Sequence, residues 1–299
     1  MSGHSRSTTL LGIALGSLLT AYHASATEHG GDNIGQGSEG FFAGALPAPG
    51  WYAVGYADHY DADRFNDGQG HAAMPSFHLT ADVLAARLFY MSDLTLAGGR
   101  VGVFAIGSVA TLRSETPDGR ARRDGAGDIT VGPTVGWEHG AWHSLVALDI
   151  SLPTGSYDAS RPLNTGNNYY SIRPIYAFSY LPENGLEASA KITYTFNTSN
   201  PATHYRSGQL FHFDYSLSYR VTDQLRLGVN GYLIKQTTND RQYGSRVGTD
   251  GFRGRVFAIG PAAHYELGKT SIDLKVLREY AVRNRAEGTS VWAKAVVPF

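Results

Sequence analysis

Apolar and polar residues alternate one by one along much of this chain, and this pattern constrains its fold more than any other feature. In the segment 186–197, Ala190, Ile192 and Tyr194 share one face, while charged and hydroxyl-bearing residues occupy the other. The segment 208–220 repeats the pattern. Successive side chains of a β-strand point to opposite faces, whereas a helix would scatter the same residues around a cylinder. The alternation therefore predicts an all-β protein whose strands each separate an apolar from a polar environment.

Twelve candidate strands emerge when the whole chain is searched for this pattern. The segment 98–112 has the weakest pattern, because Phe104 and Ile106 make its second face apolar as well. The twelve expected strands span residues 50–60, 76–90, 98–112, 127–138, 140–152, 168–180, 185–197, 207–220, 223–238, 252–267, 269–281 and 289–299.

The connections between these segments alternate in length. After the even-numbered segments they are mostly tight, as at Thr222-Asp223 and Gly268-Lys269, and 91–97 is a longer exception. Short turns on one side, long loops on the other and an even number of strands are typical of bacterial outer-membrane barrels. After the odd-numbered segments the connections are mostly long and polar, at 61–75, 113–126, 153–167, 198–206, 239–251 and the shorter 282–288.

A sheet in a membrane must be closed, because an unpaired backbone amide or carbonyl is costly in hydrocarbon. We therefore expect strand 289–299 to pair with strand 50–60, so that residues 50–299 form one closed antiparallel transmembrane β-barrel. Val297 and the final Phe299 end an alternating strand and serve as the C-terminal signal for the barrel-assembly machinery. Aromatic residues near strand ends suit two interfacial girdles: Tyr52, Tyr56, Tyr60, Tyr90, Trp137, Trp142, Tyr170, Tyr180, Tyr219 and Tyr265.

Residues 1–26 have the features of a cleaved signal peptide. The apolar run 10–19 is followed by Ala24-Ser25-Ala26, which offers a cleavage site of small residues. The run is well short of the roughly 20 residues that a membrane-spanning helix needs. We therefore expect export, a mature chain that begins at Thr27, and residence in the outer membrane of a Gram-negative bacterium.

The composition excludes several other kinds of site. Because the chain has no cysteine, it has neither a disulfide framework nor a thiolate metal site. A net charge of −1 argues against nucleic acid as a partner. His143 and Ser144 are adjacent, so in a strand they point to opposite faces and cannot form a nucleophile–base pair. We expect no enzyme activity, no cofactor and no metal, and as partners membrane lipid, lipopolysaccharide and a small solute.

The segment 27–49 precedes the barrel and is rich in glycine and proline. It carries a small apolar group formed by Phe41, Phe42 and Leu46. Two interpretations stay open: the segment folds back into the lumen as a small plug, or it is a loose periplasmic leader.

The expected inward faces carry charges of both signs. One interpretation is a lattice of ion pairs that stiffens the barrel, because a buried charge needs a partner. The other is a constriction whose charges select what passes, and mixed signs argue against strong anion or cation selectivity. Asp82 and Arg87 fall on opposite faces of one strand, so either Asp82 lies above the membrane or a bulge intervenes. The candidates for the lumen or constriction are Arg173, Glu187, Lys191, His212, Asp214, Arg226, Tyr232, Asp273, Lys275, Trp292 and Lys294.

One group of known proteins resembles this chain through most of its mature length. In the motifs given below, the chain resembles the outer-membrane proteins involved in the meta-pathway of phenol degradation. The resemblance implies a barrel that passes aromatic or other apolar small molecules, and it supplies no functional residues to carry over. The motifs are Ser38-Glu39-Gly40-Phe41, 44–50, Gly127-Asp128-Ile129, Gly132-Pro133, 153–157, 196–205, Ser207-Gly208, Gly260-Pro261 and Pro298-Phe299.

These features predict an outer-membrane channel for the passive uptake of small hydrophobic or aromatic molecules, which the resemblance links to aromatic catabolism. A barrel of this strand number should be narrow and partly filled by side chains, which favours a selective channel over a general porin. The segment 27–49 is far too short for the folded plug domain of an energised transporter. Two alternatives remain: a structural or adhesive barrel with a sealed lumen, and a barrel enzyme that acts on lipid.

Overall fold

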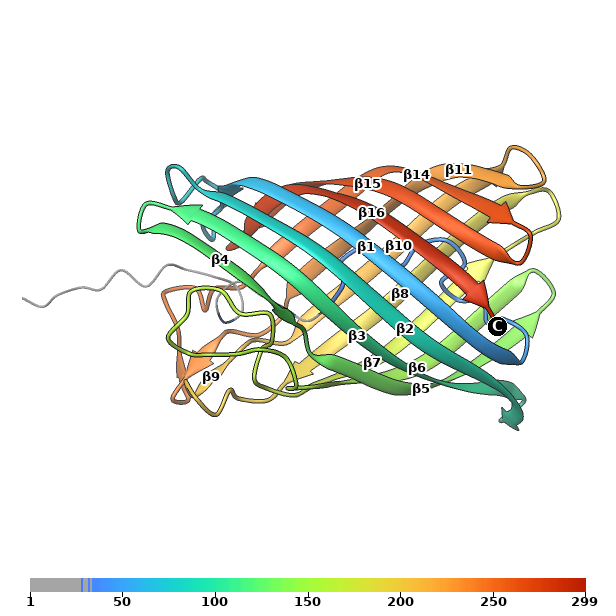
Figure 1. Ribbon diagram of the computed structural model, residues 1–299, viewed down its shortest axis with the longest axis horizontal. Coiled ribbons are helices and arrows are strands. Elements are labelled where there is room, and N and C mark those ends of the chain that lie inside the picture. Colours follow the sequence, from blue (N-terminus) through green and yellow to red (C-terminus); the bar gives the residue numbers. More distant parts are fainter. Residues whose placement is uncertain (1–27, 29–31, 33) are drawn as a thin grey trace, which may run out of the picture.

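The strands form a closed antiparallel barrel in the computed structural model, which describes residues 28, 32 and 34–299 (Figure 1). The expected signal peptide, residues 1–26, lies outside the described residues. β1 (Gly50–Phe65) pairs with β16 (Ala286–Pro298) along nearly its whole length, from Tyr52 opposite Pro298 to Phe65 opposite Ala286. The expected closure between the first and last strands is therefore confirmed.

Twelve strands make up the wall, as the alternation predicts. β4 (Gly119–Ala126) and β5 (Ile129–His139) pair with successive parts of β3 (Gly99–Thr116), so together they count as one interrupted strand. β9 (Tyr205–Arg206), β12 (Arg241–Gln242) and β13 (Ser245–Arg246) form a small separate sheet. The other wall strands are β2 (His78–Leu96), β6 (Trp142–Leu152), β7 (Ser171–Tyr180), β8 (Leu186–Asn197), β10 (Leu210–Arg220), β11 (Leu225–Gln236), β14 (Arg255–Leu267) and β15 (Thr270–Arg283). No helix among the described residues is long and apolar enough to span a membrane.

The two ends of the barrel differ. At the end that we call the turn end, strands are joined by short turns such as Ala97-Gly98 and Gly268-Lys269. The barrel also begins and finishes there, and the Phe299 amide donates to the Trp51 carbonyl at 3.0 Å. At the opposite end, the loop end, the chain forms the long connections 66–77, 153–170, 198–209 and 237–254.

Three predicted connections are strand rather than loop. Residues 113–126 continue β3 and return as β4, with a turn at Pro117-Asp118. The predicted loop 282–288 is reduced to Asn284-Arg285, because β15 and β16 extend into it. β2 likewise runs through the predicted 91–97 connection as far as Leu96. The turn end is thus more uniform than predicted, and part of the loop end consists of long hairpins.

The β3–β4 hairpin was predicted as a loop because it is stabilised by polar pairs across its strands rather than by an apolar face. Both faces of this hairpin are polar, so its sequence lacks the alternation that marks the other strands. Arg120 instead pairs with Glu115 at 3.0 Å, and the Thr111 hydroxyl donates to Asp124 at 2.6 Å. Such cross-strand pairs stabilise a hairpin whose two faces are in the same solvent.

The outer surface of the wall is apolar, and the lumen is polar. Exposed leucines cover the outside of several strands, among them Leu84, Leu217 and Leu274. The inward faces carry buried hydroxyl and amide groups such as Ser189 and Thr193. This distribution is that of a barrel wall with lipid outside and a polar interior.

Aromatic rings gather on the outer surface near the turn end. The rings of Trp51 and Tyr90 lie 4.7 Å apart, and so do those of Trp142 and Tyr180. These four residues occupy the place that an interfacial girdle requires.

Three tyrosines expected in a girdle lie inside the barrel instead. Tyr52, Tyr56 and Tyr60 share the inward face of β1, and the last two donate hydrogen bonds to lumenal carboxylates, at 3.3 and 2.8 Å. The girdle prediction was wrong for them because it weighed only their nearness to strand ends. The strand period places all three on the face opposite Trp51.

Candidate functional site

The segment before β1 runs through the lumen from the loop end to the turn end (Figure 1). The Glu28 carboxylate accepts hydrogen bonds from Asn200 at 2.8 Å and Thr203 at 2.6 Å, both in a loop-end connection. Leu46, near the other end of the segment, packs against Gly136 of β5. The chain then enters β1 at Gly50, at the turn end.

Backbone hydrogen bonds fix this segment to one side of the wall. The Gly37 amide donates to Asp214 of β10 at 3.1 Å, and the Gly44 amide donates to the Ser179 hydroxyl of β7 at 2.9 Å. A Cβ atom at Gly44 would lie 2.3 Å from the Phe178 backbone, so a larger residue could not keep this position. Glycine is therefore required here for close approach of two backbones.

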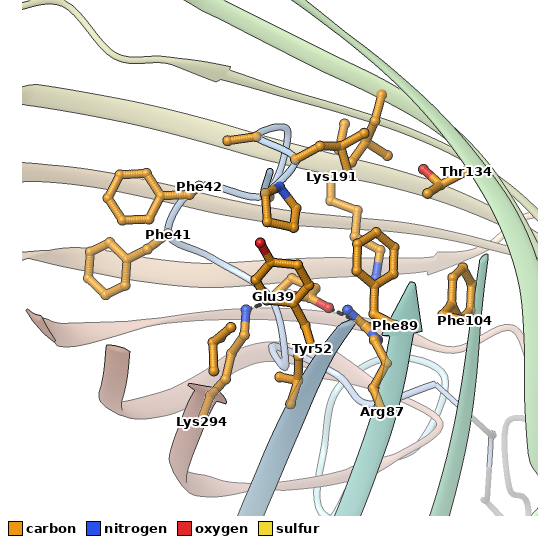
Figure 2. Close-up of a pocket in the computed structure, with 18 of the residues that line it drawn as sticks. Glu39, Phe41, Phe42, Tyr52, Arg87, Phe89, Phe104, Thr134, Lys191 and Lys294 are labelled. Atoms are coloured by element: carbon orange, nitrogen blue, oxygen red, sulfur yellow. Dashed lines mark hydrogen bonds and ion pairs between the residues drawn. The ribbon is translucent and has the colours of Figure 1, made fainter. Parts of the chain in front are cut away.

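A buried carboxylate links the segment to the opposite side of the lumen (Figure 2). Glu39 accepts from the Arg87 guanidinium at 2.7 Å and from the Lys294 ammonium at 2.8 Å, each on its own oxygen. The Tyr56 hydroxyl adds a bond at 3.3 Å, and the Lys275 ammonium donates to the Glu39 backbone carbonyl at 2.8 Å. We call these five residues the Glu39 junction.

The wall part of the junction comes from four neighbouring strands. Arg87 lies on β2, Tyr56 on β1, Lys294 on β16 and Lys275 on β15, and these strands follow one another around the barrel. Tyr56 and Lys294 are directly paired in register. Arg87 is opposite Val54 and Lys275 is opposite Trp292, each one inward position from the Tyr56–Lys294 pair. Strand pairing therefore places three cationic groups close together, facing the segment.

Two cavities lie in the lumen, one toward each end. The turn-end cavity, of about 360 Å³, is bounded by the apolar side chains of the segment and by wall residues such as Phe89 and Phe104. The loop-end cavity, of about 400 Å³, has a more polar lining. The two share Arg87, Asp149 and Lys191, so the cavities adjoin at the level of these three side chains.

Phe41, Phe42 and Leu46 form the segment's contribution to the turn-end cavity. The Phe42 ring lies 5.0 Å from the His264 ring, and the Arg226 guanidinium lies 5.2 Å from its centre. Phe42 also has a φ of 58°, a left-handed conformation that is uncommon outside glycine. The segment thus lies in the lumen, and its action as a plug stays a prediction.

The lumen candidates from the sequence all lie on inward faces, but they form several clusters rather than one site. Lys275 and Lys294 belong to the Glu39 junction, and Lys191 lies between the cavities. Arg173, Tyr232 and Trp292 line the loop-end cavity, and Asp273 lines the turn-end cavity, where it bonds His264 at 2.6 Å. The remaining four candidates are buried beneath the segment: Glu187, His212, Asp214 and Arg226. The Glu187 carboxylate accepts hydrogen bonds from Ser216 and Ser218. His212 pairs with Asp214 at 3.4 Å, and Arg226 donates to the Gly185 carbonyl.

Two central residues of the junction were not among those candidates. Glu39 lies in a segment without periodicity, so no face could be assigned to it from the sequence. Arg87 was set aside because Asp82 falls on the opposite face of β2. The structure resolves that conflict without a bulge at these positions: Asp82 is on the outer face and pairs with His59 and Arg113 at 2.7 and 2.8 Å. The two-residue period of β2, followed along its lumenal face, is sufficient to predict that Arg87 points into the lumen.

The described residues contain no group of three or more His, Asp or Glu side chains that could hold a metal ion.

A closed barrel with an apolar outer face, a polar lumen and internal cavities defines a protein of the bacterial outer-membrane barrel class. Residues 62–295 match the family described as "Putative MetA-pathway of phenol degradation", and the chain belongs to this family.

Solved structures share the fold at low sequence identity. An outer membrane channel from Pseudomonas putida F1 is 17% identical, with a TM-score of 0.77 over 86% of this chain and 98% of that one. The beta domain of the Bordetella autotransporter BrkA is 11% identical, with a TM-score of 0.52 over 85% of this chain and 100% of that one. No curated protein matches the sequence.

Proposed function

We propose that this protein is an outer-membrane channel for the passive uptake of small hydrophobic or aromatic molecules. The observation that carries the proposal is the turn-end cavity, an apolar space inside an otherwise polar lumen. Its volume falls within the roughly 300–1,000 Å³ of typical small-molecule sites. Membership of a phenol-degradation family and similarity to an outer membrane channel support the same function.

The turn end faces the periplasm in this proposal, and the loop end faces the outside. The first strand begins and the last strand finishes at the turn end, which is the periplasmic end in bacterial outer-membrane barrels. The apolar wall contacts membrane lipid and lipopolysaccharide. A sealed adhesive barrel is the alternative, and the two lumenal cavities favour the channel, because a packed core would leave no room for a solute.

Uptake by whole cells tests the proposal. A strain that lacks the gene and its complemented counterpart are given radiolabelled phenol-type and alkane-type solutes. We expect complemented cells to accumulate at least one of these solutes severalfold faster, because the outer membrane otherwise excludes apolar molecules. A strain that carries the empty plasmid is the control. Equal initial rates in all three strains would rule out the transport function and leave the barrel assignment intact.

The C-terminal strand is proposed to be read by the barrel-assembly machinery. The Phe299 side chain is 72% exposed and Val297 is 40% exposed, although both backbones pair with β1. Their exposure leaves the side chains accessible to a partner.

Deletion of Phe299 should therefore lower the amount of folded barrel severalfold while leaving synthesis unchanged. The heat-dependent shift of the folded form on gels measures this amount. Replacement of the exposed Tyr243 by alanine, at the loop end, is the control. A normal folded fraction after the Phe299 deletion would contradict the signal.

A further inference from the structure

Wall cations outnumber wall carboxylates at the level where the two cavities adjoin, once the segment is set aside. Arg87 and Lys294 form ion pairs only with Glu39 among the described residues. Lys191, which lines both cavities, has no ion-pair partner within the described part of the chain. Two wall carboxylates lie nearby: Asp149, which is 3.9 Å from Arg173, and Asp273, which is opposite Lys294 in register and bonds His264 at 2.6 Å. The Glu39 carboxylate thus supplies the direct ion pairs of Arg87 and Lys294 within the described residues.

Aromatic rings surround this same charge cluster on the side of the turn-end cavity. The Arg87 guanidinium lies 5.6 Å from the centre of the Phe104 ring and 5.4 Å from that of Tyr56. Phe89 lines the cavity beside them, as Figure 2 shows. A carboxylate at the position of Glu39 would therefore have an apolar and aromatic space directly next to it.

We propose that the permeating solute is a small aromatic carboxylate, whose carboxylate replaces that of Glu39 between Arg87 and Lys294. Its ring occupies the turn-end cavity near Phe89 and Phe104. In the absence of solute, the Glu39 carboxylate of the chain itself occupies the position that the solute carboxylate takes during passage. This inference rests on the proposed channel function and names its substrate class.

Electrostatics favours an anion over a neutral aromatic molecule for this exchange. If the segment withdraws and a neutral molecule enters, Arg87 and Lys294 lose the carboxylate that pairs with both, which is unfavourable in a lumen that excludes water. If a carboxylate enters, the lost charge-assisted hydrogen bonds are replaced by equivalent ones. The loss of the Glu39 ion pairs is then compensated, so passage depends on the charge of the solute.

Matched solutes test the charge requirement. Benzoate and benzamide have nearly the same shape, and only benzoate carries a charge at neutral pH. The full-length protein is reconstituted into liposomes, and the influx of each labelled solute is measured at equal concentration gradients, after correction for flux through protein-free liposomes. We expect protein-mediated benzoate influx to exceed that of benzamide by about tenfold or more, the factor that corresponds to one net charge-assisted hydrogen bond.

Two variants with opposite effects make the test specific to the junction. Lys294→Gln removes one cation and should lower the preference for benzoate about tenfold. Glu39→Gln removes the competing carboxylate and should raise the apparent affinity for benzoate without doing so for benzamide. Glu183→Gln, in an exposed turn at the turn end, makes the same chemical change as Glu39→Gln and should leave both values unaltered. Folding of each variant is checked by its heat-dependent gel shift.

The outcomes separate the substrate class from the channel function. Equal protein-mediated influx of benzoate and benzamide in the wild type would overturn the carboxylate inference while supporting the channel. A benzoate preference that Lys294→Gln leaves intact in a folded barrel would also overturn it. Absence of protein-mediated influx for both solutes would reject the proposed channel function itself.

Discussion

Deletion of residues 34–46 should raise the single-channel conductance of the barrel severalfold. In the intact protein this segment occupies the lumen from Ile34 to Leu46 and is held by hydrogen bonds to β7 and β10 and by the Glu39 junction. Its removal would join the turn-end and loop-end cavities into one continuous passage. Planar bilayer recordings on the purified full-length and shortened proteins, under identical salt and voltage, measure the change.

A point variant provides a milder version of the same test. Gly44→Val would place a side chain 2.3 Å from the Phe178 backbone, so the segment must move away from β7. We expect more frequent or larger openings with all charges intact. Gly55→Val is the matched control, because a Cβ atom there meets no other atom within 4 Å. A conductance that stays the same after the 34–46 deletion would contradict a plugging role for the segment.

The wall could be predicted from the sequence because each strand separates lipid from a polar lumen. This physical contrast produces the alternation, and the alternation in turn assigned the inward faces of β8, β10 and β15 correctly. It fails wherever both faces meet the same environment. The β3–β4 hairpin around Arg120 and Arg122 is polar on both faces, so its strands were interpreted as a loop.

The Glu39 junction could not be predicted for a different reason. It joins a segment without periodicity to four strands from both ends of the barrel sequence, and the separation between Glu39 and Lys294 is 255 positions. The alternation along the strand predicts that Lys294 faces inward, but it cannot predict which carboxylate pairs with it. Tyr56 illustrates the same limit, because its hydroxyl partner lies on the segment rather than on the wall.

The position of the segment in the chain limits when it can enter the lumen during folding. The segment directly precedes β1, and β1 closes the barrel by pairing with β16. The segment must therefore lie in the lumen before closure, or pass through the closed lumen afterwards. A lumen without the segment would lack the Glu39 carboxylate that pairs with Arg87 and Lys294. The threaded state is therefore the stable resting arrangement.

Single cysteines should show that the segment passes through the whole lumen. The natural chain has no cysteine, so each introduced thiol is the only one that can react. Glu28→Cys should be labelled in intact cells by a maleimide attached to a polymer too large to cross the outer membrane, because Glu28 contacts the loop-end connections. Ala48→Cys, exposed at the turn end, should react only after the cells are opened.

The expected contrast is nearly complete labelling against almost none, because the two positions lie at opposite ends of the barrel although only 20 residues separate them. Tyr243→Cys, at a highly exposed position of the loop end, provides the positive control for access from outside. Protection of Glu28→Cys in intact cells, with Tyr243→Cys fully labelled, would place the start of the segment on the periplasmic side. The segment would then be a periplasmic leader, and the Glu39 carboxylate could not be the resting counterion of Arg87 and Lys294.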